Sequence, residues 1–193
     1  RKTTLYQYGL YYDPDNHMTE KTANCGMLYV IRLCDNSLFL MDGGFLLQWN
    51  EEAMEGLWQF LRRITDTPED GTVRISCWYF THTHADHIDG CVKLLNRHHD
   101  QIALERLMFN FPLYSALGGY EPSAYYVREQ MGKWYPGVRY LKLHTGQKFT
   151  LADMELEVYY TQEDAVLPEA ITRFPMRDGN CMSSILKLTV GGK

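Results

Sequence analysis

Several protein classes are excluded by what this sequence lacks. It has no apolar run of the roughly 18 residues that a helix needs to cross a bilayer, so we expect no membrane span. Its five cysteines are scattered, odd in number and never spaced as Cys-x-x-Cys. This pattern argues against a disulfide framework and favours buried thiols in a cytoplasmic protein. A processed chain, with a signal sequence removed before Arg1, stays an alternative.

The sequence also lacks an excess of positive charge. Its formal net charge is −5 and its pI is about 5.8, which gives no general attraction to a phosphate backbone. Nucleic acid stays open as a partner through a local basic groove, but the net charge does not support it. We find no phosphate-binding glycine loop, no serine or cysteine nucleophile arrangement and no internal repeat, and nothing indicates an oligomeric state.

The composition is that of an ordinary globular domain. Of the 193 residues, 45% are hydrophobic and 22% are charged, which predicts a single domain, 1–193, with a real core. Strands and helices alternate, so we expect an α/β arrangement with helices outside the sheet. The expected strands cover residues 5–12, 26–33, 38–41, 73–80, 104–109, 154–160 and 185–190, and the expected helices cover 51–64, 86–99 and 122–134.

Residues 81 to 90 form a loop that is rich in metal-binding side chains. They read Thr-His-Thr-His-Ala-Asp-His-Ile-Asp-Gly, directly after an apolar strand. His82 and His84 are two apart, so they point the same way on an extended segment. Asp86 and His87 follow at the start of the expected helix. Imidazole and carboxylate are common zinc ligands, so the loop predicts one half of a dinuclear metal site; a solvated, histidine-rich turn is the alternative.

This His-x-His-x-Asp-His segment resembles the signature of the metallo-β-lactamase superfamily. In that family the two leading histidines bind one metal and the Asp-His pair binds the second. The resemblance therefore assigns His82 and His84 to the first metal, and Asp86 and His87 to the second. It implies two divalent ions as cofactors, with zinc as the first expectation and manganese or iron as alternatives.

A second segment supports the same resemblance. The apolar strand that ends in Asp42-Gly43-Gly44 resembles the family's early Asp-Gly-Gly, where we expect the glycines to allow a sharp turn with positive φ angles. The resemblance implies that Asp42 steadies the histidine loop from outside the ligand set. A plain turn-forming aspartate is the alternative.

One ligand position differs from the family pattern. Asn180 stands where the family usually has its third histidine, and an amide oxygen is a weaker zinc ligand than imidazole. The Asn-x-x-Ser segment before an apolar strand resembles the hydrolase domain of bacterial competence DNA-uptake proteins, which belong to the same superfamily. The alternative is that Asn180 only forms the turn that enters the strand.

The resemblance implies an αββα sandwich, which we expect to be truncated before its second half is complete. The strand at 185–190 is followed by Gly-Gly-Lys, which predicts the opening of a hairpin turn. Family members continue with an apolar strand ending in Gly-Asp, whose aspartate bridges both metals, and with a later histidine. We therefore expect an incomplete metal site in this chain.

The aromatic insertion and the remaining histidines are weaker candidates for functional residues. The segment 110–140 is rich in tyrosine and forms a lid-like aromatic insertion, which either faces a substrate or, as the simpler explanation, packs onto the domain. His98 and His99 end the second helix, where a positive charge suits the helix dipole. His17 lies in a polar loop and His144 in an expected turn.

The function implied by the resemblance is that of a metal-dependent hydrolase using a metal-bound hydroxide. Its substrate would be a small molecule or a phosphodiester, cut at a phosphodiester or other ester bond, with Asp86 orienting the hydroxide and carrying its proton. The alternative is a catalytically weak or inactive binding or regulatory module with the same fold. Redox chemistry at a di-iron site with a flavin partner domain is a third possibility.

Overall fold

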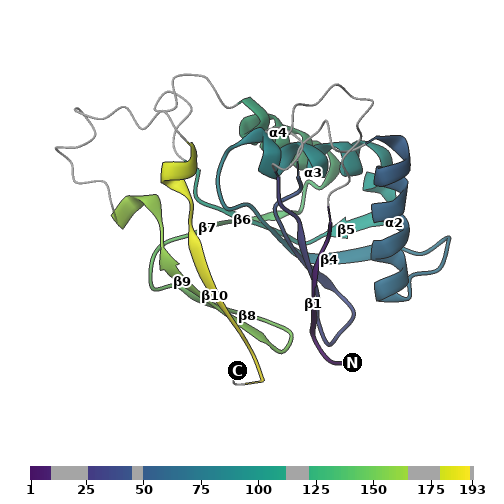
Figure 1. Ribbon diagram of the computed structural model, residues 1–193, viewed down its shortest axis with the longest axis horizontal. Coiled ribbons are helices and arrows are strands. Elements are labelled where there is room, and N and C mark those ends of the chain that lie inside the picture. Colours follow the sequence, from purple (N-terminus) through teal and green to yellow (C-terminus); the bar gives the residue numbers. More distant parts are fainter. Residues whose placement is uncertain (10–25, 45–49, 112–121, 165–178, 192–193) are drawn as a thin grey trace.

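Two β-sheets and a layer of helices form the computed structural model, which describes residues 1–9, 26–44, 50–111, 122–164 and 179–191. The helices lie on one face of the larger sheet and the smaller sheet lies on its other face (Figure 1). The described residues thus show three layers, α/β/β, of the expected αββα sandwich. No helix among them is long and apolar enough to cross a membrane.

The larger sheet has seven strands in the order β1-β2-β3-β4-β6-β7, with β5 also paired to β4. The first three strands are antiparallel, whereas β3, β4, β6 and β7 run parallel. The carboxyl ends of these parallel strands therefore meet at one edge of the sheet, where α/β proteins place their ligands. The strands are β1 (Thr4–Gln7), β2 (Tyr29–Arg32), β3 (Leu38–Met41), β4 (Val73–Tyr79), β5 (Ile102–Leu104), β6 (Arg106–Phe109) and β7 (Arg139–Lys142).

Within the described residues, three α-helices cover this sheet, and each begins and ends within one residue of its predicted bounds. They are α2 (Glu51–Thr65), α3 (Ala85–His98) and α4 (Pro122–Trp134). Asn50 caps α2, because its side chain accepts a hydrogen bond of 2.7 Å from the backbone N–H of Ala53. The residues of α2 that recur at three- and four-residue steps are buried against the sheet: Met54, Leu57, Trp58, Leu61 and Ile64.

The smaller sheet is antiparallel and has the order β10-β9-β8. Its strands are β8 (Lys148–Leu151), β9 (Met154–Tyr160) and β10 (Ile185–Val190). Along β9 the side chains of Leu156 and Val158 are buried, whereas Tyr159 is 52% exposed. The expected strand at 154–160 is therefore confirmed, and one of its faces is exposed to solvent. The short strands β7 and β8 were not predicted, and the expected strand at 104–109 is interrupted at Glu105.

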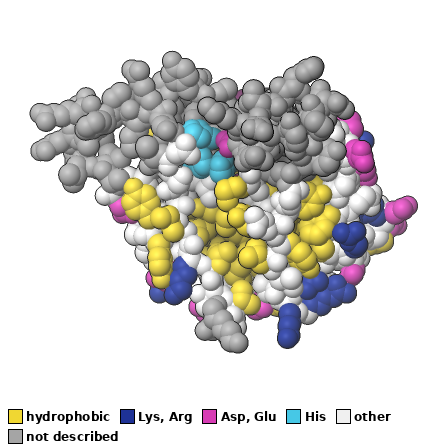
Figure 2. Space-filling view, in the orientation of Figure 1, with side chains coloured by type: hydrophobic (Ala, Val, Ile, Leu, Met, Phe, Trp, Pro, Cys, Tyr) yellow, Lys and Arg dark blue, Asp and Glu magenta, His cyan; other side chains and the backbone are white. Residues whose placement is uncertain are grey.

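The hydrophobic core consists of two clusters, one on each face of the larger sheet. One joins the helices to the sheet, and the other joins Phe39, Tyr79 and Met108 to the inner face of β9. Each fully buried side chain of this kind contributes about 1.5–3 kcal/mol, so both layers are held mainly by apolar burial. Hydrophobic side chains are visible below the histidines on the face in Figure 2. Cys77 and Cys91 are buried free thiols, as expected, whereas the free thiol of Cys34 is only half-buried.

Candidate metal centre

The histidine loop lies at the carboxyl edge of the larger sheet, between the end of β4 and the start of α3. β3 is the parallel neighbour of β4, so the residue after β3 lies beside this loop. The backbone N–H of Asp42 donates to the carbonyl of Tyr79 over 2.8 Å, which fixes the two strand ends together. The histidines gather at one place on the surface in Figure 2.

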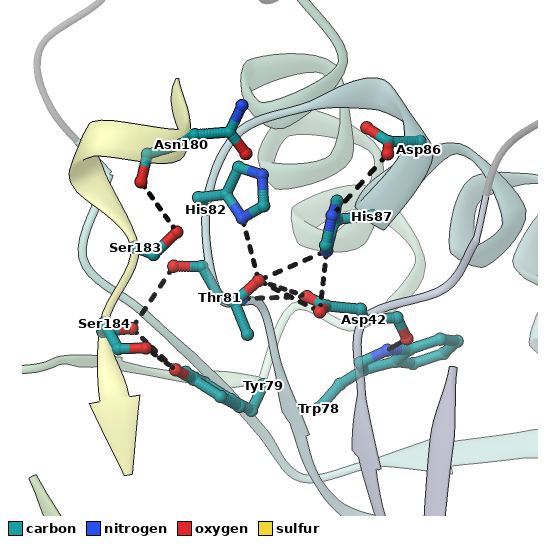
Figure 3. A network of polar contacts seen from close by, with 10 residues as sticks. All are labelled: Asp42, Trp78, Tyr79, Thr81, His82, Asp86, His87, Asn180, Ser183 and Ser184. Carbon is teal, nitrogen blue, oxygen red and sulfur yellow. Dashed lines mark hydrogen bonds and ion pairs between the residues drawn. The ribbon is translucent and has the colours of Figure 1, made fainter. Parts of the chain in front are cut away.

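Asp42 is completely buried and its carboxylate holds the loop from behind. One oxygen accepts from the backbone N–H of Thr81 over 2.9 Å, and the other accepts from His87 Nδ1 over 2.8 Å. The hydroxyl of Thr81 lies 3.1 and 3.0 Å from the two oxygens. A buried carboxylate that accepts hydrogen bonds in this way fixes the positions of its partners (Figure 3). Its role toward a bound metal stays a prediction.

Gly43 and Gly44 follow Asp42 for two different reasons. Gly44 has a positive φ of 75°, as expected, and Asp42 itself has a φ of 59°. A Cβ at Gly43, however, would lie 2.6 Å from the backbone nitrogen of Cys91 in α3. Gly43 thus lets α3 approach the end of β3, and the expectation of a positive φ at that residue is wrong.

The four predicted ligands of the loop lie next to one another. The ring centroids of His82 and His84 are 4.8 Å apart, and those of His82 and His87 are 4.0 Å apart. Asp86 Oδ2 lies 3.7 Å from His87 Nε2. Within the described residues, however, no three His, Cys, Asp or Glu side chains converge in an arrangement that could hold a metal ion. The ligands are therefore gathered, but a complete coordination shell is not formed by these residues.

Hydrogen bonds in this cluster determine which ring nitrogens face a ligand. Because the Thr81 hydroxyl donates to Asp42, it is free to accept from His82 Nδ1, 3.0 Å away. His87 Nδ1 donates directly to Asp42. In both imidazoles the proton is then on Nδ1 and the lone pair is on Nε2. Neutral imidazole that is unprotonated on Nε2 is a form that binds divalent metals, so the donor set fits zinc or a similar ion.

The charge of Asp42 also acts on the pKa of His87. Burial lowers this pKa, but the hydrogen bond to Asp42 and the charges of Asp42 and Asp86 outweigh burial, so the pKa is raised overall. A more basic imidazole is a stronger electron donor once it is deprotonated. The same partners therefore orient His87 and increase its basicity.

Asn180 lies beside the histidine loop. It belongs to the short helix η6 (Gly179–Met182), and its side chain extends over the ring of His82 (Figure 3). The segment is held by Ser184, whose backbone N–H donates to the carbonyl of Thr81 over 3.0 Å. The hydroxyls of Ser184 and Tyr79 are 2.7 Å apart and both are buried. The start of β10 is thus bound directly to the end of β4. Whether Asn180 binds a metal stays a prediction.

Sequence reasoning missed three residues of this network, which are Thr81, Tyr79 and Ser184. Thr81 precedes the motif by one residue, so its place next to the ligands was a usable indication. Tyr79 and Ser184 are 105 residues apart, and no pattern in the sequence relates them. Burial raises the pKa of the Tyr79 phenol, which therefore stays protonated and serves as a hydrogen-bond donor.

The other histidines with described positions lie outside the cluster. His98 is buried and stacks on Trp58 with centroids 4.4 Å apart. Burial lowers its pKa, so the expected positive charge at this helix end is wrong for His98. His144 contacts Glu163 over 2.6 Å in the predicted turn. His17 lies outside the described residues.

Comparison with solved structures identifies the fold. Zinc-bound PqqB from Methylobacterium extorquens matches with a TM-score of 0.53 and 10% identity, over 98% of this chain and 60% of that chain. YhfI from Bacillus subtilis, a metallo-β-lactamase fold protein, matches with a TM-score of 0.51 and 12% identity, over 98% of this chain and 58% of that chain. The chain therefore has the metallo-β-lactamase fold and spans somewhat more than half the length of these two proteins.

Other comparisons give no closer assignment. No family model matches the sequence, and no curated protein matches it. Neither structural neighbour is a competence protein, so that part of the predicted resemblance stays a prediction.

Proposed function

We propose that this chain provides the first half of the active site of a metal-dependent hydrolase that cleaves a phosphodiester or another ester bond. The observation that carries the proposal is the cluster of His82, His84 and His87 beside Asp86, held from behind by Asp42. His82 and His84 would hold one divalent ion, and Asp86 and His87 a second. When bound, such ions supply a hydroxide near neutral pH, because they lower the pKa of water from 15.7 to about 7.

The residues of the chain would orient the reactants around that hydroxide. The Asp42–Thr81 pair would keep the Nε2 lone pairs of His82 and His87 directed away from Asp42. Asp86, whose side chain is 26% exposed at the first turn of α3, is placed to accept a proton and pass it to the leaving group. Asn180, beside His82, would donate an amide N–H to an oxygen of the substrate.

The test is hydrolysis of bis(p-nitrophenyl) phosphate by the natural gene product after loading with zinc or manganese. We expect metal-dependent release of nitrophenol that falls at least about a hundredfold in Asp86→Asn, because general acid–base groups contribute roughly 10²–10⁴-fold. His144→Gln is the matched control, since His144 pairs with Glu163 outside the cluster. Equal rates with and without metal, or in Asp86→Asn and the wild type, contradict the proposal.

A second candidate is a binding or regulatory module with the same fold that holds metal weakly or not at all. Two features favour it: no three donors among the described residues are arranged so that they could hold a metal ion, and Asn180 stands where the family resemblance implies a histidine. For this module we expect no bound metal after zinc-replete expression and no metal-dependent hydrolysis. We also expect that a metal chelator does not change the folding of such a module.

A further inference from the structure

A hollow of about 180 Å³ lies at the edge of the larger sheet, between α4 and the carboxyl ends of β6 and β7. It is smaller than the roughly 300–1,000 Å³ of sites for drug-sized ligands, so it suits one flat base, with the rest of a larger ligand lying outside it. Two of its lining residues are cations and none is an acid. The lining residues are Phe109, Phe111, Arg128, Tyr140, Leu141 and Lys142.

Aromatic rings form one wall of this hollow. Phe109 and Phe111 stack with centroids 4.4 Å apart, and Tyr140 meets Phe109 edge to face at 6.2 Å. Tyr140 is 39% exposed and its hydroxyl donates to the carbonyl of Arg128 over 3.1 Å. The tyrosine ring is thus fixed in position while part of its surface remains open. Fixed, open aromatic rings are the surfaces on which flat rings such as nucleobases stack.

Positive charge lies next to these rings. The guanidinium of Arg128 is 5.5 Å from the centre of the Tyr140 ring. Lys142 is bonded to Glu163 over 2.5 Å, so Arg128 offers the stronger attraction to an incoming anion. Arginine forms two parallel hydrogen bonds with a phosphate, and it also stacks on aromatic rings. The aromatic rings and Arg128 together favour a ligand that has a flat ring and a negatively charged group.

The hollow is connected to the histidine loop by neighbouring rings. Phe80 directly precedes the loop, and its ring lies 6.4 Å from that of Phe111. β6 is paired directly with β4, and β7 with β6. Because paired strands are about 4.8 Å apart, the hollow lies roughly 5–10 Å to the side of the strand that carries the loop. A single substrate could contact both.

We propose that this hollow binds one nucleotide unit of the substrate, with the base against Tyr140 and its neighbouring phenylalanines and the phosphate beside Arg128. The role of the hollow as a substrate subsite rests on the proposed hydrolase function, because the metal centre at the histidine loop would then cut the phosphodiester next to the bound nucleotide. Binding itself does not depend on that function. A net charge of −5 is no obstacle to a local site of this kind.

The experiment is calorimetric titration of the metal-free protein with AMP, adenosine and inorganic phosphate. AMP should bind most tightly, because only AMP offers both the ring and the anion. Tyr140→Leu should weaken AMP binding about 5- to 100-fold, the loss associated with one stacked base, while Tyr140→Phe should retain most of it. Arg128→Gln should weaken AMP binding but leave adenosine binding unchanged.

Tyr159→Leu is the matched control. Tyr159 is also an exposed tyrosine with a cation near its ring, Lys187 at 5.8 Å, but it lies on the smaller sheet. Its substitution should leave AMP binding unchanged. Equal affinity for AMP and phosphate, or equal AMP affinity in wild type, Tyr140→Leu and Arg128→Gln, overturns the subsite. AMP binding with the expected losses but without any hydrolysis supports the subsite and overturns the proposed function alone.

Discussion

The hydrogen bond between Asp42 and His87, 2.8 Å from carboxylate oxygen to Nδ1, joins the end of β3 to the first turn of α3. The two residues are 45 positions apart, and Asp42 is completely buried. This contact determines which nitrogen of His87 faces outward. We therefore expect the metal affinity of the site to depend on a residue that would not touch the metal.

Asp42→Asn should weaken zinc binding by about 10- to 100-fold, the usual loss when the partner of a ligating histidine is removed. The amide keeps the size of the side chain but removes the charge that favours the Nδ1–H form of His87. Titration with zinc in a competitive chelator assay measures the change. Asp35→Asn is a control, since Asp35 pairs with Arg74 away from the loop. Unchanged affinity in Asp42→Asn contradicts the role assigned to Asp42.

Thr81→Val tests the second hydrogen-bonded partner. Valine has the same shape but lacks the hydroxyl that lies between Asp42 and His82 Nδ1, so the tautomer of His82 is no longer fixed. Zinc affinity should fall about tenfold or more, with ¹⁵N chemical shifts showing a mixture of His82 tautomers. A wild-type tautomer pattern in the variant would show that Thr81 has no such role.

The contact between Tyr79 and Ser184 should stabilise the packing of the two sheets. Their hydroxyls are 2.7 Å apart, and the Tyr79 hydroxyl also lies 2.9 Å from the Ser184 carbonyl. A double-mutant cycle with Tyr79→Phe and Ser184→Ala, measured by urea unfolding, should give a coupling free energy of about 1 kcal/mol. Ser183→Ala should cost less than about 0.5 kcal/mol, because its hydroxyl bond is exposed. Strict additivity of Tyr79→Phe and Ser184→Ala would contradict the coupling.

The close approach of α3 to Gly43 predicts that a larger residue at this position destabilises the fold. Gly43→Ala should lower the free energy of unfolding by about 1–3 kcal/mol, because its Cβ would push against the backbone of Cys91. Gly137→Ala is the control, since a Cβ there meets nothing within 4 Å. Thermal unfolding followed by circular dichroism measures both. Equal melting temperatures for the two variants would rule out the steric explanation.

Stability should fall in mild acid because of His98. Its pKa is lowered by burial against Trp58, despite nearby Glu55 and Asp100, and Arg97 lowers it further. The unfolded chain therefore binds this proton at a higher pH than the folded chain. The contribution of His98 to the free energy of unfolding is fully present above about pH 6.5, the pKa of histidine in the unfolded chain. It is lost as the pH falls through the lower pKa of His98 in the folded chain.

The measurement is urea unfolding at pH 7.5 and at pH 5.5. The wild type should lose more stability between these values than His98→Gln, which does not titrate. Identical losses would show that His98 is not the group responsible.

The α2 helix and the histidine loop could be predicted from the sequence because their information is local. The three- and four-residue spacing of Met54, Leu57 and Trp58 defines a buried face without reference to the rest of the chain. Likewise, an apolar strand followed by His-x-His-x-Asp-His predicts the position of the loop, whereas its metal chemistry stays a prediction. Asp42 was identified through a resemblance, because its Asp-Gly-Gly segment at the end of an apolar strand is similar to that of the family.

The parts that sequence reasoning missed depend on distant residues. β7, with the sequence Arg-Tyr-Leu-Lys, has little strand character of its own and is extended because it pairs with β6. Ser184 is placed near the loop by the packing of one sheet on the other. The hollow beside Tyr140 needs α4, β6 and β7 together, so the tyrosine-rich composition alone did not distinguish a binding surface from a packed lid.

We expect residues 82, 84, 86 and 87 to bind divalent metal. Metal content of the natural gene product after zinc-replete expression, measured by inductively coupled plasma mass spectrometry, tests it most directly. We predict about two zinc ions per chain, as in other two-metal hydrolytic sites, falling to about one or fewer in a His82→Ala, His84→Ala double variant and unchanged in His144→Gln. Absence of zinc from the wild type, or the same zinc content in all three proteins, would contradict the account.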